Sequence, residues 1–205
     1  MRVVLASASP ARLQVLRRAG VAAEVIVSGV DEDAVAVEPA AALTLTLARL
    51  KAHAVADQLL PGDEPVLVIG CDSLLEFAGQ PQGKPADAPT AVRLWQAMRG
   101  RSGVLHTGHR AIVIDEAGTR AAERVASTVV HFAQVSDAEI EAYVATGEPL
   151  WVAGAFTVDG LGGPFVASIE GDYHNVVGLS LPLLRDLLLE LGIDWTSLWR
   201  ATPGG

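Results

Sequence analysis

Val66-Leu67-Val68-Ile69-Gly70 runs directly into Cys71-Asp72-Ser73, about a third of the way along the chain. An unbroken apolar run of this length is typical of a strand buried on both faces of a sheet. A carboxylate that follows such a strand lies at the mouth of an open α/β sheet, where the ligands of these folds gather. We therefore predict a functional site around Asp72.

The chemistry of Asp72 follows from its surroundings. An ionised carboxylate next to a buried strand needs a cation, a metal ion or hydrogen-bond donors to offset its desolvation. In return it can hold Mg²⁺ or accept a proton from water. The alternative is a structural aspartate that only caps the following turn with Ser73.

Strands and helices alternate on both sides of this run. Strands are predicted at residues 3–6, 25–27, 66–70, 103–114 and 120–135, and helices at 10–19, 40–58, 90–98, 136–146 and 181–191. Ser136-Asp137-Ala138-Glu139 has the spacing of a capping box at the start of the helix over 136–146. Short strands and turns are expected over 153–178. The alternation predicts an α/β class, with one domain over residues 1–200 and a frayed tail over 201–205.

The composition limits the class of protein. A chain of 205 residues, half of them apolar, can bury about 70% of its unfolded surface. The net charge of −9 argues against a general nucleic-acid or membrane surface. A single cysteine, Cys71, excludes an internal disulfide and fits a reducing compartment. With neither a signal-peptide pattern nor an apolar run of about 20 residues, we expect a soluble, cytoplasmic protein.

The basic residues of the chain are mostly arginines. Only two of the fifteen, Lys51 and Lys84, are lysines, and the remainder are arginines. A lysine retained in such a chain is favoured where a compact ammonium must reach a phosphate or a metal-bound oxygen. The alternative is that two lysines arose by drift.

A second candidate site is the strand-to-helix turn Ser7-Ala8-Ser9-Pro10-Ala11-Arg12. Ser9 is a plausible N-cap and Pro10 fits the first helical position. Free N–H groups and two hydroxyls at a helix start attract anions, and Arg12 offers a forked contact to phosphate. The alternative is a well-capped helix with a surface arginine.

Other polar features are less specific. One carboxylate of Asp31-Glu32-Asp33 could share a metal ion with Asp72, although a solvated loop is the default for Asp33. His106 and His109 lack zinc spacing. The Gly-rich segment 159–163 lacks the known nucleotide-loop patterns, so its glycines could simply permit tight turns.

Taken together, these segments resemble the Maf family of nucleoside triphosphate pyrophosphatases. The motifs occur in order along nearly the whole chain: Ser7-Ala8-Ser9-Pro10-Ala11-Arg12, Asp31-Glu32, Lys51-Ala52, Gly70-Cys71-Asp72-Ser73, Gly83-Lys84-Pro85, His106-Thr107-Gly108, Ala153-Gly154-Ala155-Phe156, Ile169-Glu170-Gly171-Asp172-Tyr173 and Asn175-Val176-Val177-Gly178-Leu179. The resemblance implies a two-lobed α/β fold with a central cleft and a mixed, twisted sheet, shared in outline with inosine triphosphate pyrophosphatases.

The resemblance also implies an activity. A nucleoside triphosphate would be hydrolysed between its α and β phosphates with Mg²⁺ or Mn²⁺, in a house-cleaning role against non-standard nucleotides. Asp72 would accept the proton of the attacking water, and Glu32 and Asp72 would hold the metal. The triphosphate path would be lined by Ser7, Arg12, Lys51 and Lys84, and Ser9 would also bind the substrate.

The residues that would contact the nucleobase depart from the family pattern. Members that prefer dTTP and UTP carry a second Arg where this chain has Ala11, and members that prefer 7-methyl-GTP have Trp there. Ser73 is chemically similar to the Thr that the pyrimidine-preferring members carry at this position. Asp159, however, stands where those members usually have Gln. These residues point to pyrimidine triphosphates or to relaxed specificity.

Two further expectations come from the family. Its link to septum formation leaves an alternative: a nucleotide-binding regulator of cell division with little turnover. Because members commonly form homodimers, a homodimer is an option for this chain.

Overall fold

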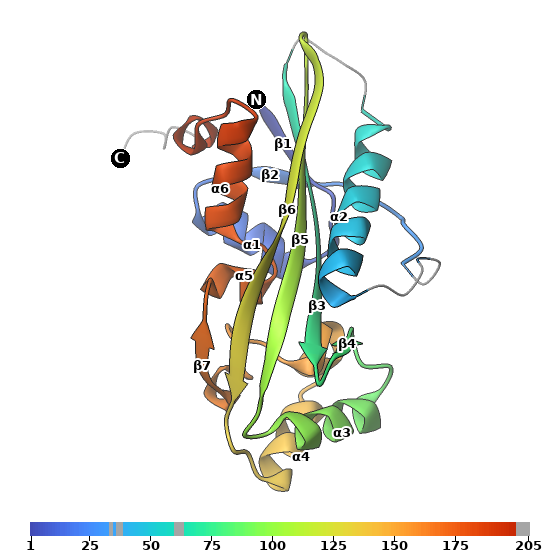
Figure 1. Ribbon diagram of the computed structural model, residues 1–205, viewed down its shortest axis with the longest axis vertical. Coiled ribbons are helices and arrows are strands. Elements are labelled where there is room, and N and C mark those ends of the chain that lie inside the picture. Colours follow the sequence, from blue (N-terminus) through green and yellow to red (C-terminus); the bar gives the residue numbers. More distant parts are fainter. Residues whose placement is uncertain (33–34, 36–38, 60–63, 200–205) are drawn as a thin grey trace.

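A seven-stranded mixed sheet forms the centre of the molecule (Figure 1). The computed structural model describes residues 1–32, 35, 39–59 and 64–199. The strands are β1 (Arg2–Leu5), β2 (Ala23–Val25), β3 (Val66–Phe77), β4 (Gln80–Gln82), β5 (Ser102–Asp115), β6 (Gly118–Phe132) and β7 (Val166–Glu170). Their order is β2-β1-β3-β5-β6-β7, with β4 on β3. β1 pairs with β2 and β3 in parallel, and the other pairs are antiparallel.

In the described part of the chain, six helices and four short 3-10 turns surround the sheet. The helices are α1 (Pro10–Arg18), α2 (Ala40–Ala56), α3 (Ala88–Met98), α4 (Asp137–Ala145), α5 (Tyr173–Val177) and α6 (Leu181–Glu190). The 3-10 turns are η1 (Glu148–Trp151), η2 (Ala153–Ala155), η3 (Gly163–Phe165) and η4 (Trp195–Leu198). The predicted α/β class is confirmed.

The core is divided along the long strands β3, β5 and β6. On one face of the upper half, Leu16 of α1 and Leu184 of α6 pack against Ile69. On the other face, Ala52 of α2 packs against Val68. A third cluster fills the lower half around α3 and α4, the two helices that lie at the bottom of the view in Figure 1. The arrangement gives two lobes that share one continuous set of strands.

The local capping chemistry was predicted correctly. Ser9 is the N-cap of α1 and Pro10 its first residue. Ser136 and Glu139 form a capping box at the start of α4, each side chain accepting a hydrogen bond from the other's backbone N–H. These short-range signals therefore fixed the helix starts that they predicted.

Several predicted strands need correction. The strand predicted to end at Gly70 continues to Phe77, so Asp72 lies inside β3 rather than after it. The strand predicted at 25–27 is Ala23–Val25, and the strand predicted at 120–135 is Gly118–Phe132. The short strand β4 was missed, and segment 153–178 holds two 3-10 turns and α5 besides β7. Asp33 and the predicted tail, 201–205, lie outside the described residues.

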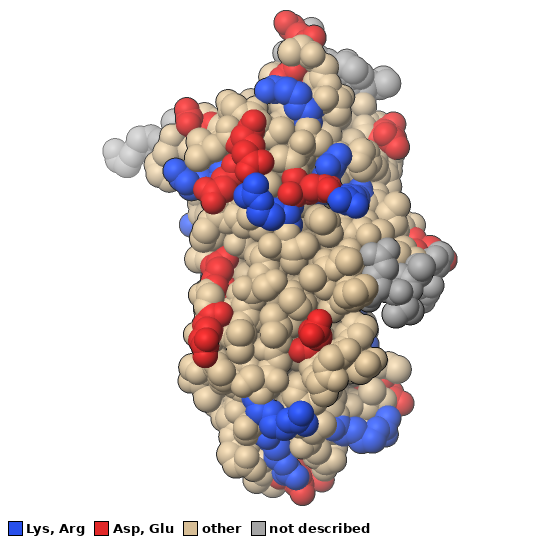
Figure 2. All heavy atoms as spheres, in the orientation of Figure 1, with Lys and Arg blue, Asp and Glu red and all other residues tan. Residues whose placement is uncertain are grey.

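The net negative charge is not spread as a uniform field. Figure 2 shows acidic and basic side chains interleaved over the upper part of one face, above a largely uncharged middle. Part of the negative charge is neutralised locally by ion pairs such as Arg124–Glu190 and Arg120–Asp115. Exposed pairs of this kind contribute little stability each. Within the described residues, no helix combines the length and apolar character needed to cross a membrane.

Candidate active site

The site begins at an open stretch of strand β3. The parallel pairing with β1 ends at Leu5–Ile69, and the antiparallel pairing with β4 begins at Leu75–Gln82. Among the described strands, none pairs with residues 70–74 on this side. The backbone of β3 is therefore unpaired by these strands over residues 70–74 on this side, and Asp72 lies within this open stretch of strand edge.

Alternation along β3 sends successive side chains to opposite faces of the sheet. Gly70 and Asp72 lie on the face that α2 covers, whereas Cys71 and Ser73 lie on the face of α1. Two polar clusters result, one on each face. The charge of Arg12, in the second cluster, still reaches Asp72 and favours its ionised form.

The first cluster joins two carboxylates through one ammonium. Lys51 Nζ lies 2.6 Å from Asp72 Oδ1 and 2.7 Å from Glu32 Oε1. Lys51 and Asp72 are each only 7% exposed, while the Glu32 side chain is half exposed. The three residues named separately from the sequence therefore meet at one point.

Close packing of α2 on the sheet puts Lys51 there. A Cβ atom on Gly70 would lie 2.4 Å from the carbonyl oxygen of Ala48, and one on Gly108 would lie 2.3 Å from that of Thr44. Gly108 pairs with Asp72 across β3 and β5. Only glycine lets the helix backbone approach the strands this closely. The approach brings Lys51, at the next turn of α2, to the carboxylate.

The environment of Asp72 shifts its protonation. Burial raises the pKa of its carboxyl, and the positive charges of Lys51 and Arg12 oppose this shift. The net direction is upward. A buried carboxylate with a raised pKa is a better proton acceptor than an exposed one, and groups perturbed in this way cluster at catalytic sites.

The second cluster is built around the guanidinium of Arg12. Its Nε donates to Gly178 O at 2.7 Å, Nη1 to Ser7 Oγ at 3.0 Å and Nη2 to Ser73 Oγ at 2.9 Å. Ser73 Oγ lies 2.9 Å from Thr107 Oγ1. Arg12 is 8% exposed, so it is a buried, fully oriented fork rather than a surface arginine.

Ser9 lies at the same turn but has a different partner. Its Oγ accepts from Arg12 N at 3.4 Å, which caps α1, and its own N–H donates to Ser7 Oγ at 3.2 Å. The side chain is thus engaged in the cap, and its N–H in the turn. Ser9 therefore caps α1, and its part in substrate binding stays a prediction.

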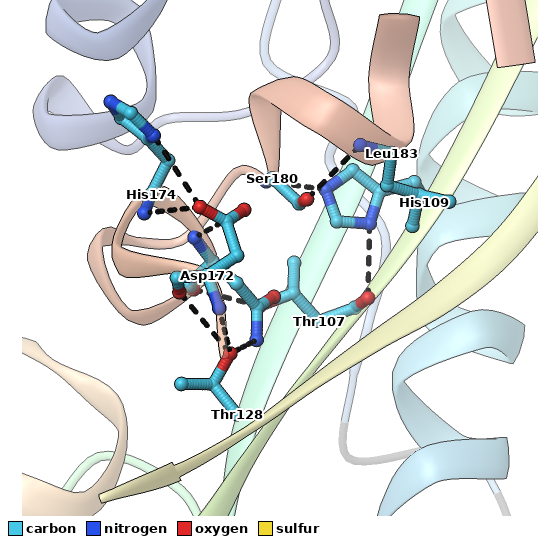
Figure 3. A network of polar contacts seen from close by, with 8 residues as sticks. Thr107, His109, Thr128, Asp172, His174, Ser180 and Leu183 are labelled. Atoms are coloured by element: carbon cyan, nitrogen blue, oxygen red, sulfur yellow. Dashed lines mark hydrogen bonds and ion pairs between the residues drawn. The ribbon is translucent and has the colours of Figure 1, made fainter. Parts of the chain in front are cut away.

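A buried polar network adjoins the arginine cluster and is connected to it through Thr107 (Figure 3). Thr107 Oγ1 donates to Asn175 O at 3.3 Å, and Asn175 Nδ2 donates to Thr128 Oγ1 at 3.0 Å. Thr128 Oγ1 in turn donates to Asp172 O at 3.1 Å, and Asp172 caps α5. The resemblance included most of these segments, but no residue-type signal identified Thr107 or Asn175 as parts of the site, because their partners lie far away in sequence.

His109 anchors helix α6 to β5 in the same network. Its Nδ1–H donates to Thr107 O at 3.0 Å, and its Nε2 accepts from the N–H of Ser180, the N-cap of α6, at 2.9 Å. Burial lowers the pKa of His109 to about 4. The imidazole is therefore neutral near pH 7, with the tautomer that both hydrogen bonds require.

Lys84 stands apart from Lys51. It is exposed, and its side chain has no hydrogen bond or ion pair within the part of the chain that the structure describes. Its neighbour Gly83 is held by a hydrogen bond of 3.0 Å from Gly154 N to Gly83 O. This bond ties two of the segments that carry the family resemblance to each other and leaves the Lys84 ammonium available to a ligand.

A pocket of about 140 Å³ opens beside α1. Its lining comes from α1, α5, the start of α6 and the loop before η3: Ala11, Gln14, Val15, Arg18, Ala19, Asp159, Tyr173, His174, Val177 and Leu181. Ala11 and Asp159, the two departures from the family pattern, thus line the same pocket although 148 positions separate them.

The carboxylate pair fits a hard divalent cation. Among the described residues there is no group of three or more metal-binding side chains. Asp72 and Glu32 nevertheless converge on one cation, the Lys51 ammonium, and both supply oxygen. Mg²⁺ in phosphate-handling sites is commonly held by one or two carboxylates, with water and phosphate oxygens completing the shell.

Comparison with known proteins shows which family the sequence matches. The family described as Maf-like protein matches residues 2–191. A nucleoside triphosphate pyrophosphatase of Salinispora tropica is 63% identical and covers 100% of this chain and 92% of its own length. One from Streptomyces coelicolor is 58% identical, covering 97% and 94%. The solved structure of the Staphylococcus aureus Ham1 protein overlaps 65% of this chain and 73% of its own, with 17% identity and a TM-score of 0.36, too low to add weight.

The family resemblance carried by the ordered motifs is therefore confirmed over nearly the whole sequence. The chain belongs to the Maf family.

Proposed function

We propose that this protein is a nucleoside triphosphate pyrophosphatase, which releases a nucleoside monophosphate and pyrophosphate. The observation that carries the proposal is the pair of carboxylates on Lys51, set at an open strand edge close to the buried Arg12 fork. The relatives that share more than half of its residues bear the same activity in their names.

Asp72 is the proton acceptor. A water oxygen forms a bond to phosphorus, the P–O bond between the α and β phosphates breaks, and the water proton passes to the Asp72 carboxylate. The raised pKa of Asp72, caused by burial, supports this role. Phosphoryl displacement requires positioning and charge stabilisation more than covalent catalysis.

The surrounding cations orient the phosphates. The Arg12 fork and the Ser7 and Ser73 hydroxyls provide donors on one face of β3, and Lys51 provides a positive charge on the other. Lys84, exposed on its own loop, neutralises oxygens that gain charge as pyrophosphate leaves.

Glu32 and Asp72 would hold a Mg²⁺ or Mn²⁺ ion. When bound, this ion lowers the pKa of water and neutralises phosphate charge. Lys51, which contacts both carboxylates, holds them close together.

The pocket beside α1 receives the base. Ala11 provides neither a guanidinium fork nor a stacking ring, and an ionised Asp159 can only accept hydrogen bonds. Such a pocket offers few discriminating contacts, which supports pyrimidine triphosphates or a relaxed base specificity.

The first experiment measures turnover of dTTP, UTP, CTP and 7-methyl-GTP with Mg²⁺ and with Mn²⁺. We expect pyrophosphate and monophosphate in stoichiometric amounts and no reaction in EDTA. Orthophosphate as the first product would contradict the cleavage position.

Asp72→Asn tests the proton acceptor. Because the amide keeps the shape but accepts no proton, we expect a loss of kcat of at least about 10²-fold. Nucleotide binding, followed by calorimetry, should persist, which separates catalysis from folding. A variant with the wild-type rate would rule out Asp72 as the base.

A further inference from the structure

The loop at residues 157–162 carries Asp159 and is held by a single carboxylate. Glu148, in η1, accepts a hydrogen bond from Thr157 Oγ1. It also accepts from the N–H groups of Leu161 and Gly162, each at 3.1 Å. A fourth donor, Tyr143 Oη, lies 3.0 Å from Glu148 Oε1. Two carboxylate oxygens thus fix both ends of this loop.

The glycines of the loop reflect how closely it fits on this anchor. A Cβ atom on Gly160 would lie 2.7 Å from Glu148 Oε2. One on Gly162 would lie 2.5 Å from Tyr143 Oη and 2.7 Å from Thr157 O. Glycine is therefore required for close approach to the carboxylate and the phenol. The Gly-rich segment that matched no nucleotide-binding pattern has a structural explanation.

The anchor belongs to the lower lobe, whereas Asp159 lines the pocket beside α1. Tyr143 of α4 is buried and makes edge-on ring contacts with Trp95 at 5.6 Å and with Phe165 at 5.4 Å. The loop therefore connects the rigid aromatic core of one lobe to a pocket whose other wall, including Ala11, belongs to the other lobe.

Glu148 stays ionised at neutral pH. Burial raises its pKa, but the hydrogen bonds from Thr157, Leu161 and Gly162 outweigh that effect, so the net shift is downward. All four donors therefore meet an acceptor that carries a full charge, and such bonds are stronger than neutral ones.

We propose that Glu148 is a positioning residue for nucleobase recognition: it fixes loop 157–162 so that the Asp159 carboxylate lies at the pocket wall opposite Ala11. The proposal rests on the assignment of this pocket to the base. Among the described residues, Glu148 makes no hydrogen bond or ion pair with Arg12 or with the carboxylate pair, so it acts on base affinity and not on bond cleavage.

The test compares Glu148→Gln with Glu139→Gln. Glu139 is a matched control because it also accepts bonds from a backbone N–H and a hydroxyl, but in the capping box of α4. For the best nucleotide of the panel we expect Glu148→Gln to raise KM about tenfold with kcat within about twofold. Glu139→Gln should leave both within about twofold. Thr157→Val, which removes one donor to Glu148, should shift KM in the same direction.

A double variant tests whether Glu148 acts through Asp159. If it does, adding Glu148→Gln to Asp159→Ala should change KM by less than about twofold, because the carboxylate to be positioned is already gone. An equal effect in both backgrounds, or an unchanged KM in Glu148→Gln, overturns the proposal.

Two readouts keep this test separate from the proposed activity. Nucleotide affinities measured by calorimetry should follow the same pattern as KM. Amide hydrogen exchange at Leu161 and Gly162 should accelerate in Glu148→Gln but not in Glu139→Gln. If the wild type released no pyrophosphate, the proposed activity would fail, and unchanged exchange or affinity would independently reject the role of Glu148.

Discussion

The two lysines of this chain occupy different environments. Lys51 fills the space between Asp72 and Glu32 at 2.6 and 2.7 Å, whereas Lys84 is exposed. A guanidinium at position 51 would have to displace one carboxylate, since it is broader than an ammonium. We predict that Lys51→Arg lowers kcat/KM by roughly 10²-fold, the cost of misplacing a catalytic group by about 1 Å. Lys84→Arg should lose less than about tenfold.

Steady-state kinetics on both variants checks this difference. Unfolding in urea serves as the control, because a lower rate with unchanged stability indicates misplacement and not loss of fold. Equal losses in the two variants would mean that the buried position of Lys51 does not matter.

Individual site residues could be named from the sequence because the chemistry limits the choice. A carboxylate beside a buried strand and lysines in an arginine-rich chain are unusual enough to be noticed one at a time. Glu148 was not predicted, since the residues on either side of it give no local signal of its role. Its role depends on donors nine to fourteen positions further along the chain.

Helix α2 and strand β3 form the element pair on which the carboxylate cluster depends. A methyl group at position 70 would lie 2.4 Å from Ala48 O and 2.8 Å from Ala52 Cβ. Gly70→Ala must therefore move α2 outward and take Lys51 away from Asp72. We predict a loss of about 1–3 kcal/mol in unfolding free energy, together with a lower kcat/KM.

Gly83→Ala is the matched control. A Cβ there meets only Leu74 Cδ2, at 3.7 Å, which is ordinary contact. Its unfolding free energy, measured by urea denaturation, should stay within about 0.5 kcal/mol of the wild type. If Gly70→Ala were equally stable, α2 would have to be free to shift on the sheet.

The end of β3 was predicted wrongly, and the structure shows why. The sequence predicted an end at Gly70 because polar residues interrupt the apolar run there. In the structure the strand continues, and the opening at Asp72 arises because β1 is short and β4 pairs only from Leu75 onward. The lengths of neighbouring strands are not encoded in the run itself, so the true position of the gap required the fold.

At the scale of the whole molecule, residues distant in sequence meet where the lobes join. Ala11 and Asp159 line one pocket, and Arg12 donates to Gly178 across 166 positions. The order of the family motifs predicted the two-lobed α/β fold, because that order is a property of the whole chain. Which motifs share a face of the sheet could not be read from order alone, since it depends on strand register.

Folding stability should fall in mild acid because His109 is buried and neutral. Burial lowers its pKa to about 4 in the folded state, against about 6.5 in the unfolded chain. Between these values the unfolded state binds more protons, so stability decreases as pH falls from 6.5 to about 4, by about 3 kcal/mol in total. Asp72 contributes with the opposite sign, because burial raises its folded pKa and protonation then favours the folded state.

The difference between wild type and His109→Gln isolates the histidine, since the carboxylates are common to both. The variant loses stability at pH 7 with the Ser180 and Thr107 bonds, yet its unfolding free energy should decline less between pH 6.5 and 4.5. Urea denaturation at several pH values measures both proteins. Parallel curves for wild type and His109→Gln would mean that the imidazole accepts a proton without disturbing the contact between β5 and α6.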